Sequence, residues 1–167
     1  MVNWKKHLIK MNPCPGGMSW LDRFSGTLAQ AWLQCPSGAW LMWVAARSCV
    51  SRRLLVAAAC EWMQPIIKIE PACKPVLREI ELWTQGESTL DGVELKNEVF
   101  LKLPLVDVTV LDCMENLMDL IQHGEACYAD TVIMAMGDFG IPMKSSARVV
   151  RRHITWRMIC GKWEEDA

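Results

Sequence analysis

The chain has almost no net charge, since its 18 Lys and Arg residues nearly balance its 19 Asp and Glu residues, for a formal net charge of -1. Such a balance provides no global electrostatic field that would attract nucleic acid or an anionic membrane, although it leaves room for local patches. We therefore expect no direct nucleic-acid partner and no membrane partner.

The chain also lacks an uninterrupted apolar run. Lys10 and Pro13 stand where a signal peptide needs its apolar segment. The most apolar stretch, residues 38–63, contains three arginines, and each of these charges is costly at the centre of a bilayer. These features favour a cytoplasmic protein in which the apolar stretch forms buried helices.

Closely spaced cysteines are absent as well. The chain has eight cysteines, and no two of them lie closer than eleven positions apart. The short Cys pairs of structural zinc sites are therefore missing, and a chain of this length has a large enough core to fold without disulfides. We expect the cysteines to be reduced, with no metal and no cofactor bound.

Motifs of catalysis are missing too. The sequence contains no Gly-rich phosphate loop and no HExxH, and none of its three histidines, His7, His123 and His153, belongs to a recognisable nucleophile motif. We predict that the chain is not an enzyme. The alternative is a small enzyme whose site is assembled from dispersed cysteine and histidine.

Helical periodicity is what the sequence does have. Apolar residues make up 51% of the 167 residues, which suits one globular domain spanning residues 1–167. Leu28, Ala31, Trp32 and Cys35 follow the spacing of one helix face, and Thr27 precedes them as an N-cap. Similar patterns, bounded by Pro, Gly or a capping residue, recur at residues 39–47, 52–64, 75–86, 89–101, 126–136 and 144–162. Thr89 can cap the helix at 89–101, whose apolar stripe includes Val93 and Leu101. The helix at 144–162 is expected to turn Ile154 and Met158 inward.

The segment 105–111 is ambiguous, because its alternation of apolar and polar residues also suits a strand. A helix is favoured because Val110, Cys113, Leu117 and Ile121 extend one apolar stripe over several turns. Together the patterns predict an all-α protein, a compact bundle or array of about eight short helices.

Five tryptophans belong to these apolar stripes, and we expect them to lie in the core, because large rings supply much burial per residue. The alternative is an aromatic binding cleft. These residues are Trp32, Trp40, Trp43, Trp62 and Trp83.

Two clusters of charge are candidate partner-binding surfaces. Asp112, Glu115 and Asp119 recur at helical spacing opposite the apolar stripe of their segment, and would form an acidic surface for a basic partner. Arg148, Arg151 and Arg152 fall on one side of the last predicted helix. This basic face is either solvated and paired with the acidic stripe, or recognises an acidic protein, or binds nucleic acid.

Four segments resemble an alanine-rich helical family of bacterial and phage immunity proteins of polymorphic toxin systems. They are residues 32–47, 52–60, 75–87 and 149–154. The likeness covers about residues 12–100 and 145–156, whereas residues 100–136 are bulky and acidic where members of the family carry long Ala/Asp-rich helices. The resemblance implies a helical cytoplasmic protein that binds and neutralises a partner protein.

The leading hypothesis is thus a non-enzymatic protein that neutralises a toxin or another effector. Many such targets are nucleases, whose substrate sites are basic, so the acidic surface is the expected contact. The alternative is a phage-encoded inhibitor of a host defence complex of the CRISPR type, in which the same acidic surface imitates nucleic acid. The sequence does not indicate an oligomeric state.

Overall fold

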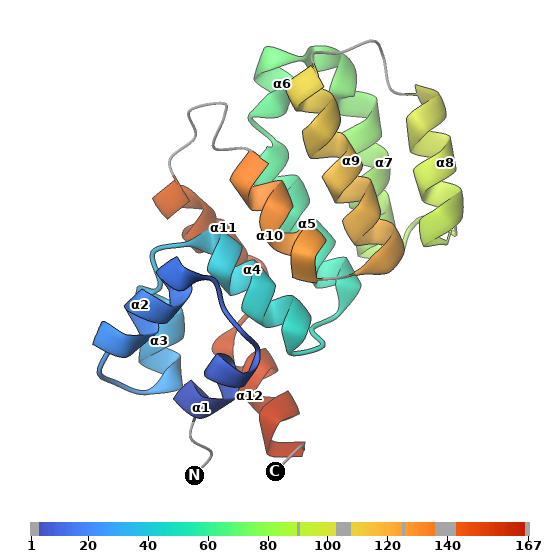
Figure 1. The fold of residues 1–167 in the computed structure, drawn as a ribbon. Helices are drawn as coiled ribbons and strands as arrows, with labels where there is room; N and C mark the ends of the chain where they lie inside the picture. The colour runs from blue at the N-terminus through green and yellow to red at the C-terminus, as the bar shows by residue number, and fades with distance from the viewer. Residues whose placement is uncertain (1–3, 90, 103–107, 125, 136–142, 166–167) are drawn as a thin grey trace.

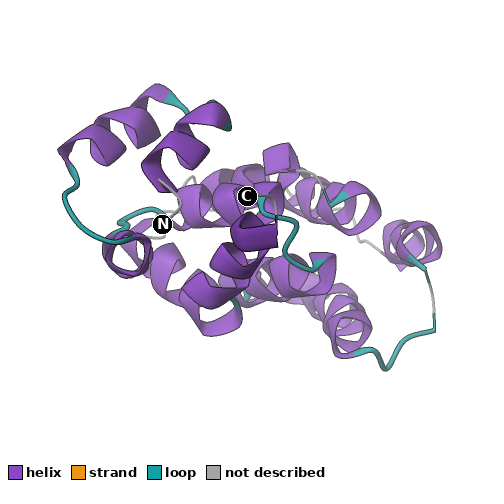
Figure 2. Ribbon diagram, turned by 90° about the horizontal axis from the view of Figure 1, so that it is seen from below, coloured by secondary structure: helices purple, strands orange, loops and turns teal. Residues whose placement is uncertain are grey.

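The computed structural model describes the chain except residues 1–3, 90, 103–107, 125, 136–142 and 166–167. The described part is 80% helical and contains no strand (Figure 2). The prediction of an all-α fold is therefore confirmed. Residues 108–111 of the ambiguous segment are helical, while residues 105–107 lie outside the described part.

The helices are short and follow one another closely along the chain. In order they are α1 (Trp4–Lys10), α2 (Pro15–Arg23), α3 (Leu28–Gln34), α4 (Gly38–Arg47), α5 (Arg52–Met63), α6 (Ile66–Ile69), the 3-10 turn η1 (Pro71–Cys73), α7 (Lys74–Gln85), α8 (Gly92–Lys102), α9 (Val108–His123), α10 (Ala126–Ala135), α11 (Met143–His153) and α12 (Trp156–Glu165).

The helices form an elongated array with a middle and two ends (Figure 1). Helices α4, α5, α10 and α11 pack together in the middle. Helices α6 to α9 gather at one end, which we call the α9 end. Helices α1 to α3 and α12 form the other end, together with both termini, and we call it the terminal end.

Helix α4 is the centre of this array. It has no polar side chain between Gly38 and Ala46, so it needs neighbours on several sides. Helices α10 and α11, which come from the last third of the chain, are its chief neighbours. At its start the Gly38 N–H donates a hydrogen bond of 3.1 Å to Oγ of the fully buried Ser146 on α11. The two helices therefore approach closely at a small residue on each side.

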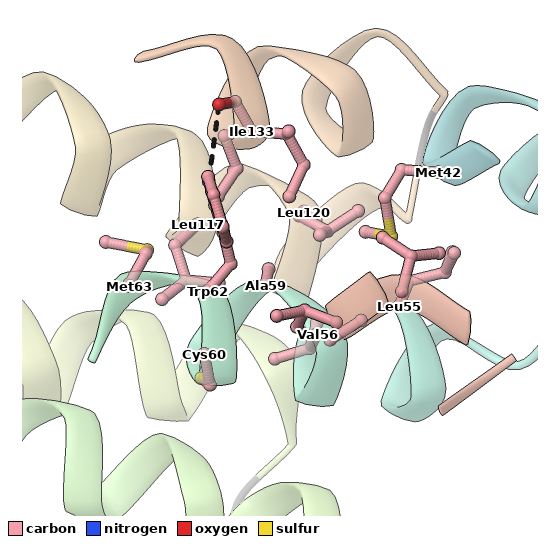
Figure 3. Packing of buried hydrophobic residues seen from close by; sticks show 14 of the residues in the cluster. Met42, Leu55, Val56, Ala59, Cys60, Trp62, Met63, Leu117, Leu120 and Ile133 are labelled. Carbon is pink, nitrogen blue, oxygen red and sulfur yellow. Dashed lines mark hydrogen bonds between the residues drawn. The ribbon is translucent and has the colours of Figure 1, made fainter. Parts of the chain in front are cut away.

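Helix α5 carries the core from the middle to the α9 end. Its buried face includes Leu55, which lies beside Met42 of α4, and Trp62, which lies beside Leu117 of α9 (Figure 3). The Trp62 indole N–H donates to the backbone carbonyl of Ile133 on α10 at 3.4 Å, so this ring has a polar partner inside the core.

Several helix boundaries are where the local sequence predicts them. Thr27 and Gln30 form a reciprocal capping box at the start of α3: the Thr27 hydroxyl accepts from the Gln30 N–H at 3.2 Å, and Gln30 Oε1 accepts from the Thr27 N–H at 2.8 Å. Gly86 ends α7 in the left-handed region, with φ of 80°, where glycine is favoured.

Helix α8 differs from its prediction. Thr89 is not its cap, because the Asp91 carboxylate accepts hydrogen bonds from the N–H groups of Val93 and Glu94, at 2.8 and 2.9 Å. The Glu94 side chain accepts in return from the Asp91 N–H at 3.0 Å. This second capping box starts the helix later than the expected stripe and turns Leu95 into the core, so Val93 and Leu101, expected inside, are exposed.

The last predicted helix, residues 144–162, is two helices. The chain leaves α11 after His153, buries Ile154 completely, and begins α12 after Thr155, whose carbonyl accepts from the Met158 N–H at 3.1 Å. Thr is favoured at such a starting position. As a consequence Met158, which the single helix would have turned inward, is 42% exposed.

The approach of α4 to α11 gives a stability prediction. A Cβ at Gly38 would lie 2.6 Å from the Ser146 carbonyl carbon and against the Ser146 hydroxyl. Gly38→Ala therefore forces the backbones of α4 and α11 apart, and it should lower the free energy of unfolding by about 1–3 kcal/mol or more. Gly17→Ala is the control, because its Cβ would meet the nearest atom at 3.5 Å, an ordinary contact. Urea denaturation of both variants tests this, and equal stabilities would contradict the close approach.

Candidate functional site

The predicted acidic surface forms on α9. Asp112 and Glu115 are exposed and Asp119 is half-buried, while Val110 and Cys113 on the opposite face are buried. This two-sided helix agrees with the spacing of the residues in the sequence. The side chains that the sequence brings together as a stripe are thus carried on one helix at the α9 end of the molecule (Figure 1).

The charges of the whole chain are segregated in a way that the net charge conceals. Residues 66–123, which form the α9 end, contain eleven acidic and five basic residues. Residues 1–34, which include α1 to α3 of the terminal end, contain one acidic and four basic residues. Because these segments lie at different ends of the array, the molecule has an acidic end and a basic end.

The three predicted arginines of α11 have different surroundings, although Arg148 and Arg152 are both exposed. Arg151 is half-buried and holds the end of α3: its Nε donates to the Trp32 carbonyl at 2.9 Å, and its Nη2 donates to the Cys35 carbonyl. Carbonyls at a helix C-terminus carry partial negative charge, so a guanidinium is favoured there. Burial lowers the pKa of Arg151.

Arg152 and His153 are tied to α5 instead. Both contact the Glu61 carboxylate, Arg152 through Nη2 and His153 through Nε2 at 2.6 Å. The acidic partner of Arg152 is therefore Glu61 rather than the α9 stripe. Two of the three arginines thus make contacts that join α11 to α3 and α5, which a sequence pattern cannot reveal because the partners lie far away along the chain.

The His153–Glu61 pair has the form of a base oriented by a carboxylate, which raises the question of a nucleophile. Cys60 precedes Glu61, but it is buried, and burial followed by the charge of Glu81 raises the pKa of its thiol, so it stays protonated. Across the side chains that the structure describes, no group of three or more His, Cys, Asp or Glu residues has the arrangement of a metal site. Seven cysteines are described there and none of them is joined in a disulfide, while Cys127 lies outside this set.

The five tryptophans predicted to lie in the core divide into two groups. Trp32, Trp62 and Trp83 are buried, as predicted. Trp40 and Trp43 are half-buried, so their assignment to the core is wrong. They lie on the side of α4 that faces α1 to α3, because residues of these helices line one pocket together with both rings. Trp20 of α2 is also half-buried and lies beside Trp40, with ring centroids 6.3 Å apart.

These half-buried rings border a pocket of about 90 Å³ between α4 and helices α1 to α3 of the terminal end, which we call the tryptophan pocket. Helices α1 to α4 and the turn before α2 supply its walls. The lining residues are Leu8, Pro13, Cys14, Gly17, Trp20, Leu21, Leu28, Ala31, Trp32, Cys35, Trp40, Leu41, Trp43 and Val44.

The tryptophan pocket is almost entirely apolar. None of its described lining side chains is charged or carries a hydroxyl, amide or carboxylate; their polar groups are indole N–H groups and thiols. Burial, the largest effect, raises the pKa of the Cys35 thiol to about 11, so this thiol is neutral. The indole Nε1 of Trp32 is buried and has no hydrogen-bond partner. The sequence signal for this pocket was the density of tryptophan near two adjacent glycines, Gly16 and Gly17, which leave room beside the Trp40 ring.

The role of Arg151 can be separated from that of its exposed neighbour. Arg151→Met removes both hydrogen bonds to the end of α3, so the free energy of unfolding should fall by about 1–3 kcal/mol, as for other hydrogen bonds to charged groups. Arg148→Met, on the same helix, should change it by less than about 0.5 kcal/mol because the side chain is exposed. Thermal denaturation compares the two variants. If Arg151→Met were as stable as the wild type, its hydrogen bonds would not stabilise the fold, and Arg151 would again be a candidate for contact with a partner.

Comparisons with known proteins give no relative. No family model matches the chain, and neither a curated protein nor a solved structure is similar to it. Within the described residues, none of the helices combines the length and the apolar character needed to span a bilayer.

Proposed function

We propose that this chain is a non-enzymatic protein-binding protein that neutralises a toxin or another effector, and that its acidic α9 end receives a basic target. The observation that carries the proposal is the segregation of charge, with Asp112 and Glu115 exposed on α9. The resemblance of residues 32–47 and 75–87 to immunity proteins points the same way.

Charge complementarity gives such a surface two advantages. It accelerates the encounter with a basic partner well above the rate of a neutral pair, and it disfavours acidic partners. An excess of six acidic residues over residues 66–123 supplies the necessary field at one end, whereas the basic terminal end would repel the same partner. A basic target would therefore approach in one orientation.

The α9 surface is also held in place before any partner arrives. The inner face of α9 is completely buried at Leu117, Met118 and Ile121. At its C-terminus the Arg52 guanidinium from α5 donates to the Ile121 and Gln122 carbonyls, at 2.8 and 2.7 Å. A helix fixed in this way loses little conformational freedom on binding, which favours affinity.

The test combines capture of a partner with charge reversal. The wild-type chain, used as bait in its native cell, should retain a basic protein, which mass spectrometry identifies. With that protein purified, Asp112→Lys/Glu115→Lys should slow association by about tenfold or more at low salt, and raising the salt should slow the wild type, because screening acts over about 8 Å at physiological ionic strength. Co-expression should relieve the toxicity of the target, and the double reversal should weaken this relief.

The matched control is Asp22→Lys on α2, compared with Glu115→Lys alone. Both positions are exposed and both reversals change the net charge equally, but Asp22 belongs to the terminal end. Only Glu115→Lys should slow association. Binding that depends neither on salt nor on the double reversal would contradict the proposal. If nucleic acid competes with this chain for the target, the target is a nucleic-acid-binding protein whose substrate the acidic surface imitates.

A further inference from the structure

Helix α8 has apolar side chains on two opposite faces. On its inner face Leu95 is completely buried, where α8 packs against α7 and α9. On its outer face Val93 and Leu101 are 50% and 83% exposed, and the exposed Asn97 lies between them. We call Val93, Asn97 and Leu101 the α8 stripe, because each follows the last by about one turn of helix. A helix that is apolar on more than one side needs more than one neighbour.

The α8 stripe lacks such a neighbour within the part of the chain that the structure describes. Helix α8 lies at the outer edge of the α9 end (Figure 1), and the exposed fractions of Val93 and Leu101 show that no described element covers them. The reciprocal contacts of Asp91 and Glu94 fix the start of this helix. The stripe is about 12 Å long at the rise of an α-helix, which suits a second helix laid along it with apolar residues about two turns apart.

The charges around the α8 stripe indicate what can cover it. Glu94 and Glu98 each follow a stripe residue by one position, so they lie along one flank of the stripe, and both are exposed. They belong to residues 66–123, with their excess of six acidic residues. An anionic membrane surface, a nucleic acid and an acidic protein would all be repelled here, whereas a basic protein segment would be attracted.

We infer that the α8 stripe is the apolar part of the contact with the basic target, and that the target presents an amphipathic basic helix to it. Apolar side chains of that helix pack on Val93 and Leu101, while its Lys or Arg residues face Glu94 and Glu98. This inference rests on the proposed function, since it names the segment by which a basic target binds the acidic end. The carboxylates accelerate the encounter, and burial of the apolar stripe slows dissociation.

A second copy of this chain is the competing occupant. Its terminal end is basic and exposes Ile9 on α1 and Leu33 on α3. Sedimentation of the wild type separates the two cases: the chain should be monomeric at the concentrations used to measure binding. An oligomer that both Ile9→Ser/Leu33→Ser and Val93→Ser/Leu101→Ser disrupt would assign the stripe to a second copy and overturn the inference.

The experiment uses two synthetic peptides of identical composition, made of leucine, alanine and lysine and about four turns of helix long. In the facial peptide the leucines share one face, and in the scattered peptide they are spread around the helix. Their charge is equal, so the difference in affinity reports the apolar contact. Fluorescence anisotropy at low salt measures binding of each labelled peptide to the full chain. The wild type should bind the facial peptide about tenfold or more tightly, since burying a single leucine is worth such a factor.

Val93→Ser/Leu101→Ser should reduce this preference to about twofold or less. Ile9→Ser/Leu33→Ser is the matched control, because it also removes one β-branched residue and one leucine from the surface, but at the terminal end. The control should keep the full preference. Leu101→Ser alone is the second variant; its side chain is 83% exposed, so the fold should not depend on it, and it should lower the preference by itself.

The peptides also separate this inference from the proposed function. Asp112→Lys/Glu115→Lys should weaken both lysine peptides alike and keep their ratio. If the wild type binds both peptides equally and this reversal weakens both, the inference is wrong and the proposed function stands. If the reversal changes neither affinity, the result counts against the acidic α9 surface and thus against the proposed function.

Two further results would overturn the inference. One is a preference for the facial peptide that persists in Val93→Ser/Leu101→Ser, because its leucines would then bind elsewhere. The other is equal binding of a facial peptide with glutamate in place of lysine, because the occupant would then not need to be basic. Both glutamate and lysine peptides are tested on the wild type, so this comparison does not depend on any variant.

Discussion

The enclosure of α4 is the constraint on which the rest of the fold depends. A helix without a polar side chain between its first residue and Arg47 is stable only when other helices remove it from water, and α10 and α11 do most of this. Their approach requires a residue without a side chain at Gly38, since a Cβ there would meet Ser146. The side that these helices leave free is covered by α1 to α3, and incompletely, so the same constraint produces the tryptophan pocket.

Much of the fold follows from local patterns. The Thr27 cap, the Gly86 terminus and the apolar stripe of α9 each depend on residues a few positions apart, and all three are present in the structure. The errors arose where two local signals competed. At α8 the Asp91–Glu94 capping box prevails over Thr89, and after His153 the burial of Ile154 breaks a pattern that is otherwise continuous.

The candidate sites were less accessible to sequence reasoning, for reasons of distance along the chain. The acidic stripe could be predicted because one helix carries it. The role of Arg151 could not, because its acceptors on α3 lie more than a hundred positions earlier. The tryptophan pocket requires knowing which face of α4 its neighbours leave uncovered, and no periodicity within α4 distinguishes Trp40 from a core residue.

The pairing of α4 with α11 also has a consequence for synthesis of the chain on the ribosome. The Gly38–Ser146 contact joins residues 108 positions apart, so at about 5–20 residues per second α4 waits roughly 5–20 s for this neighbour to emerge. During that interval one of the most apolar helices of the protein is exposed in the nascent chain, where it can associate with other chains. Arg47 at its end and Arg52 and Arg53 shortly after it give the unfinished chain a local charge that opposes such association.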